Sequence, residues 1–259
     1  MKYIDCKAYA QEILDEVKAT PNKKELVIMS MGDNQASQSY IKGKMKDCEY
    51  CEIPYVHIHT NTYESLERYI QRFNMDSKVG GIIVQLPLPD REKEEEITNM
   101  IWSKKDVDGF VPNSKFQPCT PEGIMYVIKK ELGDDLSGKR ALVIGRGKLV
   151  GKPVAEMLLK ENCTVTVAHS KTENLDMLTA QADIIVCAVG KPNFLDLSKC
   201  VSLIVVDAGV NRDENGKLCG DCYNFNPDIH DFTYVTPVPN GIGLLTRAML
   251  MKHMVEHED

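Results

Sequence analysis

Short apolar runs alternate with amphipathic stretches along most of the chain. In the first half the apolar runs are 25–31, 55–60 and 80–87, and their lengths fit buried strands. Residues 36–51 and 63–74 lie between these runs and carry apolar side chains at helical spacing. The first half is therefore predicted to alternate strand and helix.

The same alternation continues in the second half of the chain. Its apolar runs are 140–145, 163–169, 182–190 and 202–209. Strands that alternate with helices are typical of a parallel sheet covered by helices on both faces. We therefore predict an α/β fold.

The pattern breaks at residues 103–122, which are polar, contain three prolines and lack periodicity. We expect a domain junction there, with one α/β domain over 1–119 and a second over 120–241. Both have the usual size of a domain. Residues 242–259 have helical spacing and no strand after them, so the pattern alone allows this helix to pack on either domain.

Composition narrows the class of protein. The 259 residues carry a formal net charge of −7, which argues against a protein of nucleic acids or anionic membranes. The sequence contains no run of 18 apolar residues, so no membrane span is predicted. The charged N-terminus does not resemble a secretory signal. Nine cysteines without such a signal indicate free thiols in a reducing cytoplasm.

The cysteines include two C-x-x-C pairs, Cys48 with Cys51 and Cys219 with Cys222. About 170 residues separate the pairs, far more than in a compact zinc ribbon. We expect no metal site and interpret these thiols as incidental.

A glycine-rich turn joins the run 140–145 to the helical stretch after it. Gly145, Gly147 and Gly151 give G-x-G-x-x-x-G, one residue longer than the dinucleotide fingerprint. Glycine permits a tight turn and close approach to a diphosphate, and the following helix N-terminus offers N–H groups to that anion. The turn predicts nucleotide binding, although such turns also occur for packing alone.

The next strand indicates which cofactor is used. NAD sites usually place an acidic residue about 20 residues after the turn, where it binds the ribose 2′-hydroxyl. Here the strand ends in His169, Ser170, Lys171 and Thr172, and Arg146 adds a cation within the turn. A hydroxyl group with cations suits a 2′-phosphate, so NADP is favoured over NAD. The alternative is an ordinary solvated strand end.

Tyr40 and Lys44 are four residues apart, so on a helix they share one face. A lysine acts as a base only when burial or cationic neighbours bring its pKa toward neutrality. Lys42 and Lys46 project elsewhere and are expected to be exposed. Spacing alone leaves open that Lys44 is an exposed lysine as well.

Two further features favour a site. Gln85 follows the apolar run "GIIV", and the carboxyl ends of parallel strands are where open α/β sheets bind ligands. Asp106 and Asp108 lie in the predicted junction, where ligand clefts commonly form. Both aspartates could instead cap a loop.

Seven ordered blocks carry a resemblance to a known family. "GDNQASQSYIKGKMK", "GIIVQLPLP", "KDVDGF", "PCTPEG", "GRGKLVGKP", "AHSKT" and "TPVPNGIGLLT" resemble the bifunctional methylenetetrahydrofolate dehydrogenase/cyclohydrolase family over about residues 5–250. The resemblance implies a cytoplasmic homodimer in which a substrate domain and a Rossmann domain flank a cleft. The C-terminal helix is then expected to pack on the first domain. The implied reactions oxidise 5,10-methylenetetrahydrofolate with NADP and hydrolyse the methenyl product to 10-formyltetrahydrofolate.

The resemblance also implies roles for single residues. Lys44 matches the catalytic lysine, Tyr40 a tyrosine that stacks near the pterin, Gln85 a glutamine that hydrogen-bonds the lysine, and Asp108 an acid that grips the pterin. The implied cofactor residues are Gly145, Arg146, Gly147, Ser170, Lys171 and Val210. Gly241 and Ile242 fall in the loop that closes over folate and nicotinamide.

The chain departs from the family pattern at four positions. Gly147 replaces a usual serine, Asn240 a glycine, Leu244 a proline, and Glu52 the common glycine before Ile53. These changes put cofactor preference and the balance of the two activities in question, whereas the four catalytic positions are intact.

Three other interpretations compete with this one. Short-chain dehydrogenases share Tyr-x-x-x-Lys, but there the glycine-rich turn comes first. A shikimate-type dehydrogenase would leave Gln85 and the "DVDG" block unexplained. A binding protein without chemistry is disfavoured because Tyr40, Lys44, Gln85 and Asp108 are all present.

Overall fold

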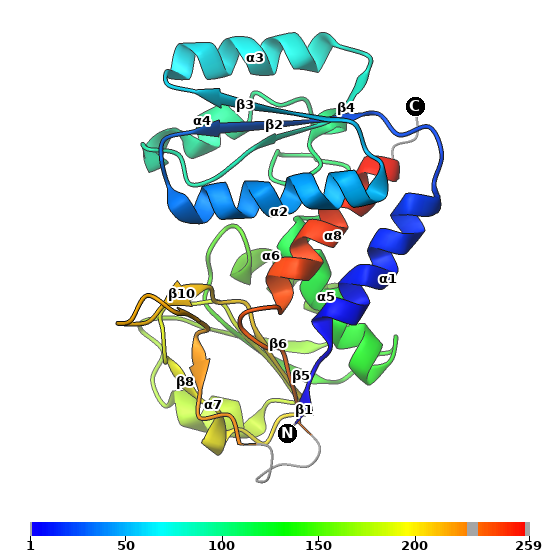
Figure 1. Cartoon of the computed structure of the whole chain (residues 1–259). Helices are drawn as coiled ribbons and strands as arrows, with labels where there is room; N and C mark the ends of the chain where they lie inside the picture. Colours follow the sequence, from blue (N-terminus) through cyan, green and yellow to red (C-terminus); the bar gives the residue numbers. More distant parts are fainter. Residues whose placement is uncertain (1, 227–232, 257–259) are drawn as a thin grey trace. The chain divides into compact units, whose positions relative to one another are not determined.

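The computed structural model describes residues 2–226 and 233–256 (Figure 1). The chain forms two compact units, which we call the N-terminal and the C-terminal unit. The N-terminal unit is Gln11–Cys119 with Arg247–Asp259, and the C-terminal unit is Met1–Ala10 with Thr120–Thr246. Each unit is built on a parallel sheet with helices, so the predicted α/β class is confirmed.

The sheet of the N-terminal unit has three parallel strands in the order β3-β2-β4. They are β2 (Glu25–Met31), β3 (Tyr55–Thr60) and β4 (Val79–Val84). β2 is apolar almost throughout because it has a strand on each side and a helix layer over each face. Figure 1 shows α2 (Gln35–Cys51) and α3 (Tyr63–Met75) on opposite faces of this sheet.

The predicted strand 80–87 ends earlier, at Val84. The Gln85 N–H still donates to the Met29 carbonyl at 2.8 Å, but the next residues are Leu86 and Pro87, and proline has no N–H to continue a ladder. Gln85 is therefore the first residue beyond the carboxyl end of β4.

Residues 103–119 of the segment predicted as a domain junction are packed within the N-terminal unit rather than forming an open linker. The segment begins with a 3-10 helix, η2 (Ser103–Lys105), and Asp106 then forms an isolated bridge with Ile82 of β4. Lys105, Asp106 and Val107 are buried. The lack of periodicity reflects a loop that is fixed by specific contacts, which pattern reasoning does not detect. The remaining short helices of this unit are η1 (Arg91–Lys93) and α4 (Glu94–Thr98).

The C-terminal unit contains a six-stranded parallel sheet in the order β1-β13-β9-β7-β5-β6. Its strands are β1 (Lys2–Tyr3), β13 (Tyr234–Val235), β9 (Ile204–Asp207), β7 (Ile184–Cys187), β5 (Arg140–Ile144) and β6 (Thr164–Ala168). The chain runs from β5 outward to β6 and then returns to the other side of β5 with β7. The carboxyl ends of β5 and β7 therefore form a topological switch point, where such sheets bind ligands.

Helices and short strands complete this unit. The helices are α5 (Cys119–Leu132), α6 (Gly151–Lys160), α7 (Leu175–Gln181) and η3 (Leu197–Lys199). The short strands are β8 (Leu195–Asp196), β10 (Asn211–Arg212), β11 (Leu218–Cys219) and β12 (Cys222–Tyr223).

The two units differ from the predicted domain boundaries at both ends of the chain. The first ten residues belong to the C-terminal unit because β1 pairs with β13. Helices α1 (Cys6–Ala19) and α8 (Ile242–Val255) each run from one unit into the other, after Ala10 and Thr246 respectively. Residues 257–259 of the predicted C-terminal helix lie outside the described residues.

Candidate active site

Helix α2 determines which of its three lysines can do chemistry. It begins at an Asn34 cap, whose side chain accepts the Ser37 N–H at 3.0 Å, and its buried residues recur at helical spacing. Lys44 lies on this buried face and is only 3% exposed, whereas Lys42 and Lys46 are exposed. The predicted difference between the three lysines is confirmed, and an exposed Lys44 is ruled out.

Lys44 has two close neighbours of suitable chemistry. Its Nζ lies 3.9 Å from Oδ2 of Asp108 and 5.4 Å from the centre of the Tyr40 ring. A buried ammonium needs such partners because its desolvation is costly. The structure thus brings together three of the four predicted catalytic residues.

Asp106 and Asp108, both in segment 103–122, make different contacts. The Asp106 carboxylate accepts the N–H groups of Gly109 at 3.1 Å and Val111 at 2.8 Å, and burial raises its pKa. It therefore builds the loop. Asp108, two residues later, is left to face Lys44.

Gln85 contributes an amide with one unsatisfied group. Its Nε2 donates to the Leu86 carbonyl at 2.8 Å, and its Oε1 is buried without a hydrogen-bond partner. A buried acceptor without a donor costs roughly 1–3 kcal/mol, so it points to a donor supplied by a ligand or a moving side chain. The expected hydrogen bond to Lys44 is not among the bonds of the described residues.

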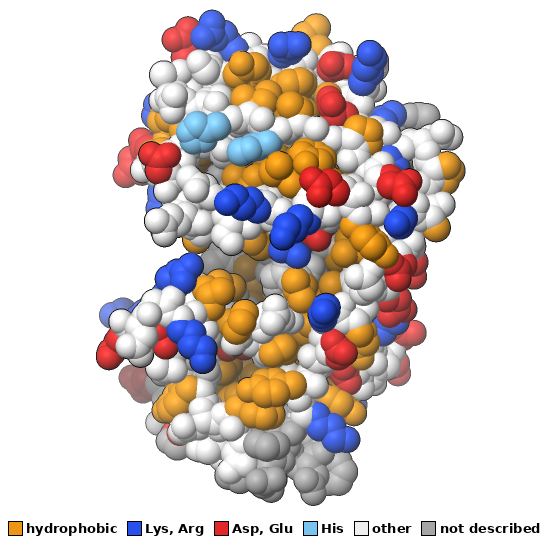
Figure 2. Space-filling view, viewed as in Figure 1, with side chains coloured by type: hydrophobic (Ala, Val, Ile, Leu, Met, Phe, Trp, Pro, Cys, Tyr) orange, Lys and Arg blue, Asp and Glu red, His pale blue; other side chains and the backbone are white. Residues whose placement is uncertain are grey.

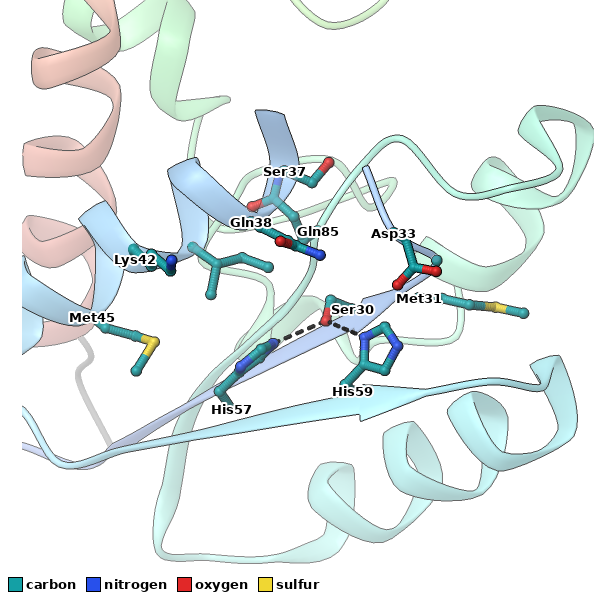
Figure 3. A pocket seen from close by; sticks show the side chains of 12 residues that line it. Ser30, Met31, Asp33, Ser37, Gln38, Lys42, Met45, His57, His59 and Gln85 are labelled. Atoms are coloured by element: carbon teal, nitrogen blue, oxygen red, sulfur yellow. Dashed lines mark hydrogen bonds between the residues drawn. The ribbon is translucent and has the colours of Figure 1, made fainter. Parts of the chain in front are cut away.

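Gln85 also lines a pocket of about 420 Å³ between α2 and the sheet (Figure 3). Other lining residues are Ser30 of β2, His57 and His59 of β3, and Lys42 of α2. Ser30 Oγ lies 2.9 Å from His57 Nε2 and 3.2 Å from His59 Nδ1. Figure 2 shows two histidine side chains next to each other on this face, close to hydrophobic side chains.

These histidines were missed by the sequence reasoning. The signal for them was the strand "YVHIHT", in which two histidines alternate with apolar residues and so share one face. Desolvation, and then the neighbouring His59, lower the pKa of His57.

The glycine-rich turn has the geometry of a nucleotide-binding turn. Gly145 has φ +112°, and a Cβ there would lie 2.2 Å from the Ala188 carbonyl oxygen. A Cβ on Gly151 would lie 2.2 Å from the Gly145 carbonyl oxygen. Both glycines are required by close backbone approach, whereas a Cβ on Gly147 would meet nothing within 4 Å. A serine would fit there, so the departure at Gly147 removes a hydroxyl group without a steric reason.

Helix α6 starts directly after this turn and offers its N-terminus. Its N-cap residue, Val150, makes no side-chain capping bond, and the Lys152 N–H of the first turn donates to the Gly147 carbonyl at 3.0 Å. Arg146 in the turn and Ser170 and Lys171 after β6 are exposed. Because β5 and β6 are neighbours in the sheet, these cations lie at the same edge as the turn. The residues present fit a dinucleotide that carries an additional phosphate.

The remaining predicted residues lie in loops after β9 and β13. Val210 is apolar and 68% exposed. Gly241 and Ile242 are buried at the start of α8, and a Cβ on Gly241 would lie 2.0 Å from the Pro237 carbonyl oxygen. Asn240 adopts φ +71°, so asparagine keeps the left-handed conformation that a glycine would take there.

Comparison with known families accounts for both units. Residues 4–108 match the catalytic domain of tetrahydrofolate dehydrogenase/cyclohydrolase, and residues 118–259 match the NAD(P)-binding domain of the same family. The chain belongs to the tetrahydrofolate dehydrogenase/cyclohydrolase family.

Individual members of the family align over nearly their whole length. The bifunctional protein FolD of Campylobacter hominis is 44% identical, with 99% of this chain and 96% of the relative covered. The crystal structure of FolD from Campylobacter jejuni is 40% identical, has a TM-score of 0.91 and covers 99% of this chain and 98% of that one. Trypanosoma brucei FolD, solved with NADP and an inhibitor, is 30% identical, has a TM-score of 0.87 and covers 98% and 95%.

Family membership confirms the predicted pair of activities. As a member of the tetrahydrofolate dehydrogenase/cyclohydrolase family, the chain is a methylenetetrahydrofolate dehydrogenase and a methenyltetrahydrofolate cyclohydrolase. In residues 2–226 and 233–256, no group of three or more His, Cys, Asp or Glu side chains is placed to hold a metal ion. The same residues contain no helix that is both long and apolar enough to cross a membrane.

Two sets of contacts near the site of this dehydrogenase/cyclohydrolase, made by Arg247 and His253, were also not predicted from the sequence. Arg247 of α8 pairs with Asp47 of α2 at 2.7 Å, and its guanidinium covers Gly43, where a Cβ would lie 2.1 Å from Nη1. His253 is buried, lies 2.8 Å from the Val107 carbonyl oxygen and stacks on Phe116 with ring centres 4.2 Å apart. Both contacts join residues 200 and 146 positions apart in sequence, so periodicity gives no signal for them.

Proposed function

We propose that Lys44, Tyr40, Gln85 and Asp108 form the folate site in which this chain converts 5,10-methylenetetrahydrofolate to 10-formyltetrahydrofolate. The observation that supports this most strongly is the buried Lys44 amine, 3.9 Å from Asp108 and next to the Tyr40 ring. A lysine buried beside a carboxylate is costly to desolvate, and such groups concentrate at functional sites.

Each side chain has a distinct part in substrate binding. Tyr40 offers a ring face on which the flat part of the folate stacks. Asp108 accepts hydrogen bonds from the pterin N–H groups, which form a planar donor pair suited to a carboxylate. The unpartnered Gln85 Oε1 accepts a bond from the substrate or from the Lys44 amine, and this relieves its desolvation.

The hydrolytic step needs a group that takes a proton. Water adds to the C–H carbon of the methenyl cation and one of its protons leaves. The second proton then passes from the new hydroxyl group to N5 as the C–N5 bond breaks, which leaves the formyl group on N10. Once the pterin occupies Asp108, the Lys44 amine is the basic group left to accept the first proton. Its burial keeps other water away and strengthens its electrostatic effect on the cation.

We propose NADP as the oxidant, which takes a hydride from the methylene carbon when bound. Gly145 and Gly151 let the backbone approach the diphosphate, and the start of α6 binds that anion. Arg146, Ser170 and Lys171 are placed to bind the 2′-phosphate, and no acidic residue stands at 169–172. The T. brucei FolD complex with NADP supports the same choice.

The roles of the units follow from this assignment. We propose that the N-terminal unit binds folate and the C-terminal unit binds NADP, and that the enzyme works as a homodimer in the cytoplasm without nucleic-acid partners. The net charge of −7 and the resemblance to FolD enzymes support this proposal. Light scattering on purified protein measures the subunit number directly.

The test is an assay of both half-reactions with NADP and NAD supplied in parallel. We expect formation of the methenyl compound to be faster with NADP at equal concentration, and its hydrolysis to proceed without any nucleotide. Reduction of NAD at the same or higher kcat/KM would contradict the proposed cofactor. Absence of hydrolysis would contradict the proposed role of Lys44.

A further inference from the structure

The carboxylate of Asp221 is buried at the edge of the proposed cofactor site. It is 0% exposed and accepts four hydrogen bonds. Oδ2 accepts the N–H groups of Val189 at 2.7 Å and Gly190 at 3.0 Å, and Oδ1 accepts the N–H of Lys191 at 2.9 Å and Nδ2 of Asn211 at 2.8 Å. These four donors are uncharged amides, so Asp221 is held as a bound anion would be.

A second carboxylate holds Asp221 in place. Asp207, the last residue of β9, accepts the Asp221 N–H at 3.0 Å and the Cys222 N–H at 2.8 Å. The Asp221 carbonyl in turn accepts the N–H groups of Phe194 at 2.6 Å and Leu195 at 3.0 Å. Asp221 is therefore fixed to the main sheet on one side and to the chain after β7 on the other.

The segment that Asp221 holds lies against the glycine-rich turn. Residues 189–191 follow β7, and the Ala188 carbonyl is the group that a Cβ on Gly145 would strike at 2.2 Å. β5 and β7 meet at the switch point of the sheet, so this segment borders the place where a dinucleotide binds.

Asp221 also controls the loop after β9. A Cβ on Gly209 would lie 2.2 Å from Asp221 Oδ1, and Asn211 donates to the same oxygen. The exposed Val210 stands between these two residues, so both of its neighbours rest on one carboxylate oxygen.

We propose that Asp221 is a positioning residue for NADP, because it fixes segments 189–191 and 209–211 at the border of the cofactor site. This inference rests on the proposed binding of NADP by the C-terminal unit. Asp221 does not touch the cofactor and acts through the backbone of the two loops.

The test is Asp221→Asn in the full chain, with three readouts. The substitution keeps the shape of the side chain but turns one acceptor oxygen into a donor NH₂ that faces other N–H groups. We expect the Kd for NADP to rise at least tenfold in calorimetry and amide hydrogen exchange at 189–191 to become faster. Hydrolysis of the methenyl compound without nucleotide should stay within twofold of wild type.

Asp183→Asn is the matched control. Asp183 precedes β7 at the opposite end of the strand and accepts both the Arg140 N–H at 2.8 Å and its guanidinium at 3.1 Å. The chemical change is identical and lies in the same unit, but we expect the Kd for NADP to stay within twofold.

Wild-type NADP affinity in Asp221→Asn would overturn the inference, as would unchanged hydrogen exchange at 189–191. Should Asp221→Asn fail to fold, Asn211→Leu removes one donor to the same carboxylate, and an increase of less than threefold in its Kd for NADP would be the contradicting result. A wild-type enzyme that binds no NADP would instead disprove the proposed cofactor. The two failures are thus distinguishable.

Discussion

Lysines 42, 44 and 46 differ in burial because of where each side chain falls around one helix. The spacing from Tyr40 to Lys44 is visible in the sequence, and the structure places the amine 5.4 Å from the ring centre. Burial of Lys44 could not be predicted from that spacing. It depends on what packs over α2, including Arg247 from the far end of the chain.

Arg146 is the residue with which the choice of NADP can be tested. It is exposed in the glycine-rich turn, where its charge is available to a 2′-phosphate but has no partner on the 2′-hydroxyl of NAD. We expect Arg146→Ala to raise the KM for NADP about tenfold or more, and the KM for NAD less than threefold. An equal rise for both nucleotides in steady-state kinetics would contradict the 2′-phosphate assignment.

We expect substitution of Gln85 to raise the stability of the protein and to lower its hydrolytic activity. Gln85→Leu removes the buried unpartnered Oε1, and the Leu86 carbonyl keeps the Ser37 hydroxyl as a donor at 3.3 Å. We expect the variant to be about 1 kcal/mol more stable in urea unfolding, while hydrolysis of the methenyl compound falls at least a hundredfold. Loss of stability, or activity within threefold of wild type, would argue that Gln85 is only part of the packing.

At the scale of elements, the sequence predicted the strands and helices that follow a clear period. β2 and β3 begin and end where the apolar runs do, and α2 and α3 differ from their predicted ranges by one residue. Segment 103–122 was not predictable, because Asp106 orders it through bonds to two backbone N–H groups rather than through a repeated pattern. β1 was missed because it has only two residues, too few for a period, and its partner is about 230 residues away.

The end of α2 carries a strained residue in place of a family glycine. Glu52 has φ 56°, in the left-handed region, and the Ile53 N–H reaches back to the Cys48 carbonyl at 2.9 Å as in a Schellman motif. We expect Glu52→Gly to raise the free energy of unfolding by about 1 kcal/mol. Lys46→Gly, at an exposed position inside the same helix, should lower it by about 1 kcal/mol. Chemical denaturation that shows the same sign for both would contradict this reading of the cap.

In the N-terminal unit, an ion pair between Arg247 of α8 and Asp47 of α2 joins the two helices. Burial raises the pKa of Asp47, and Arg247 opposes that rise. We expect Arg247→Met to cost roughly 3 kcal/mol of unfolding free energy at pH 7, because it leaves a mostly buried carboxylate unpaired.

The pH dependence of that cost follows from the direction of the shift. A carboxyl group whose pKa is raised on folding favours the folded state at low pH, and that contribution is lost as the pH rises through the folded pKa. The cost of Arg247→Met should therefore shrink as the pH falls toward 4, and Asp47→Asn added to Arg247→Met should recover most of it. Arg140→Met, which breaks an exposed pair with Asp183, should cost at most about 1 kcal/mol. A cost for Arg247→Met that does not change with pH would exclude an unpaired Asp47 as its cause.

At the scale of the whole molecule, one chain combines a catalytic domain of the tetrahydrofolate dehydrogenase/cyclohydrolase family with an NAD(P)-binding domain. The N-terminal unit holds the buried lysine, and the C-terminal unit holds the glycine-rich turn and the carboxylates that fix its neighbouring loops. The resemblance of seven blocks predicted the family and both activities. It did not predict the histidine-lined pocket, the Arg247 contact or the Asp221 network, which arise from residues brought together only by folding.

If the two units act as proposed, a single substitution separates hydrolysis from NADP binding. Lys44→Ala removes the proposed proton acceptor from the N-terminal unit and leaves the C-terminal unit unchanged. Lys46→Ala is the matched control, because Lys46 is exposed on the same helix two residues away. The most direct measurement is hydrolysis of 5,10-methenyltetrahydrofolate by Lys44→Ala, with the Kd for NADP of the same preparation. We predict that hydrolysis by Lys44→Ala falls at least a thousandfold and its Kd for NADP stays within twofold, while Lys46→Ala matches wild type in both. Hydrolysis by Lys44→Ala at more than a tenth of the wild-type rate would contradict the account.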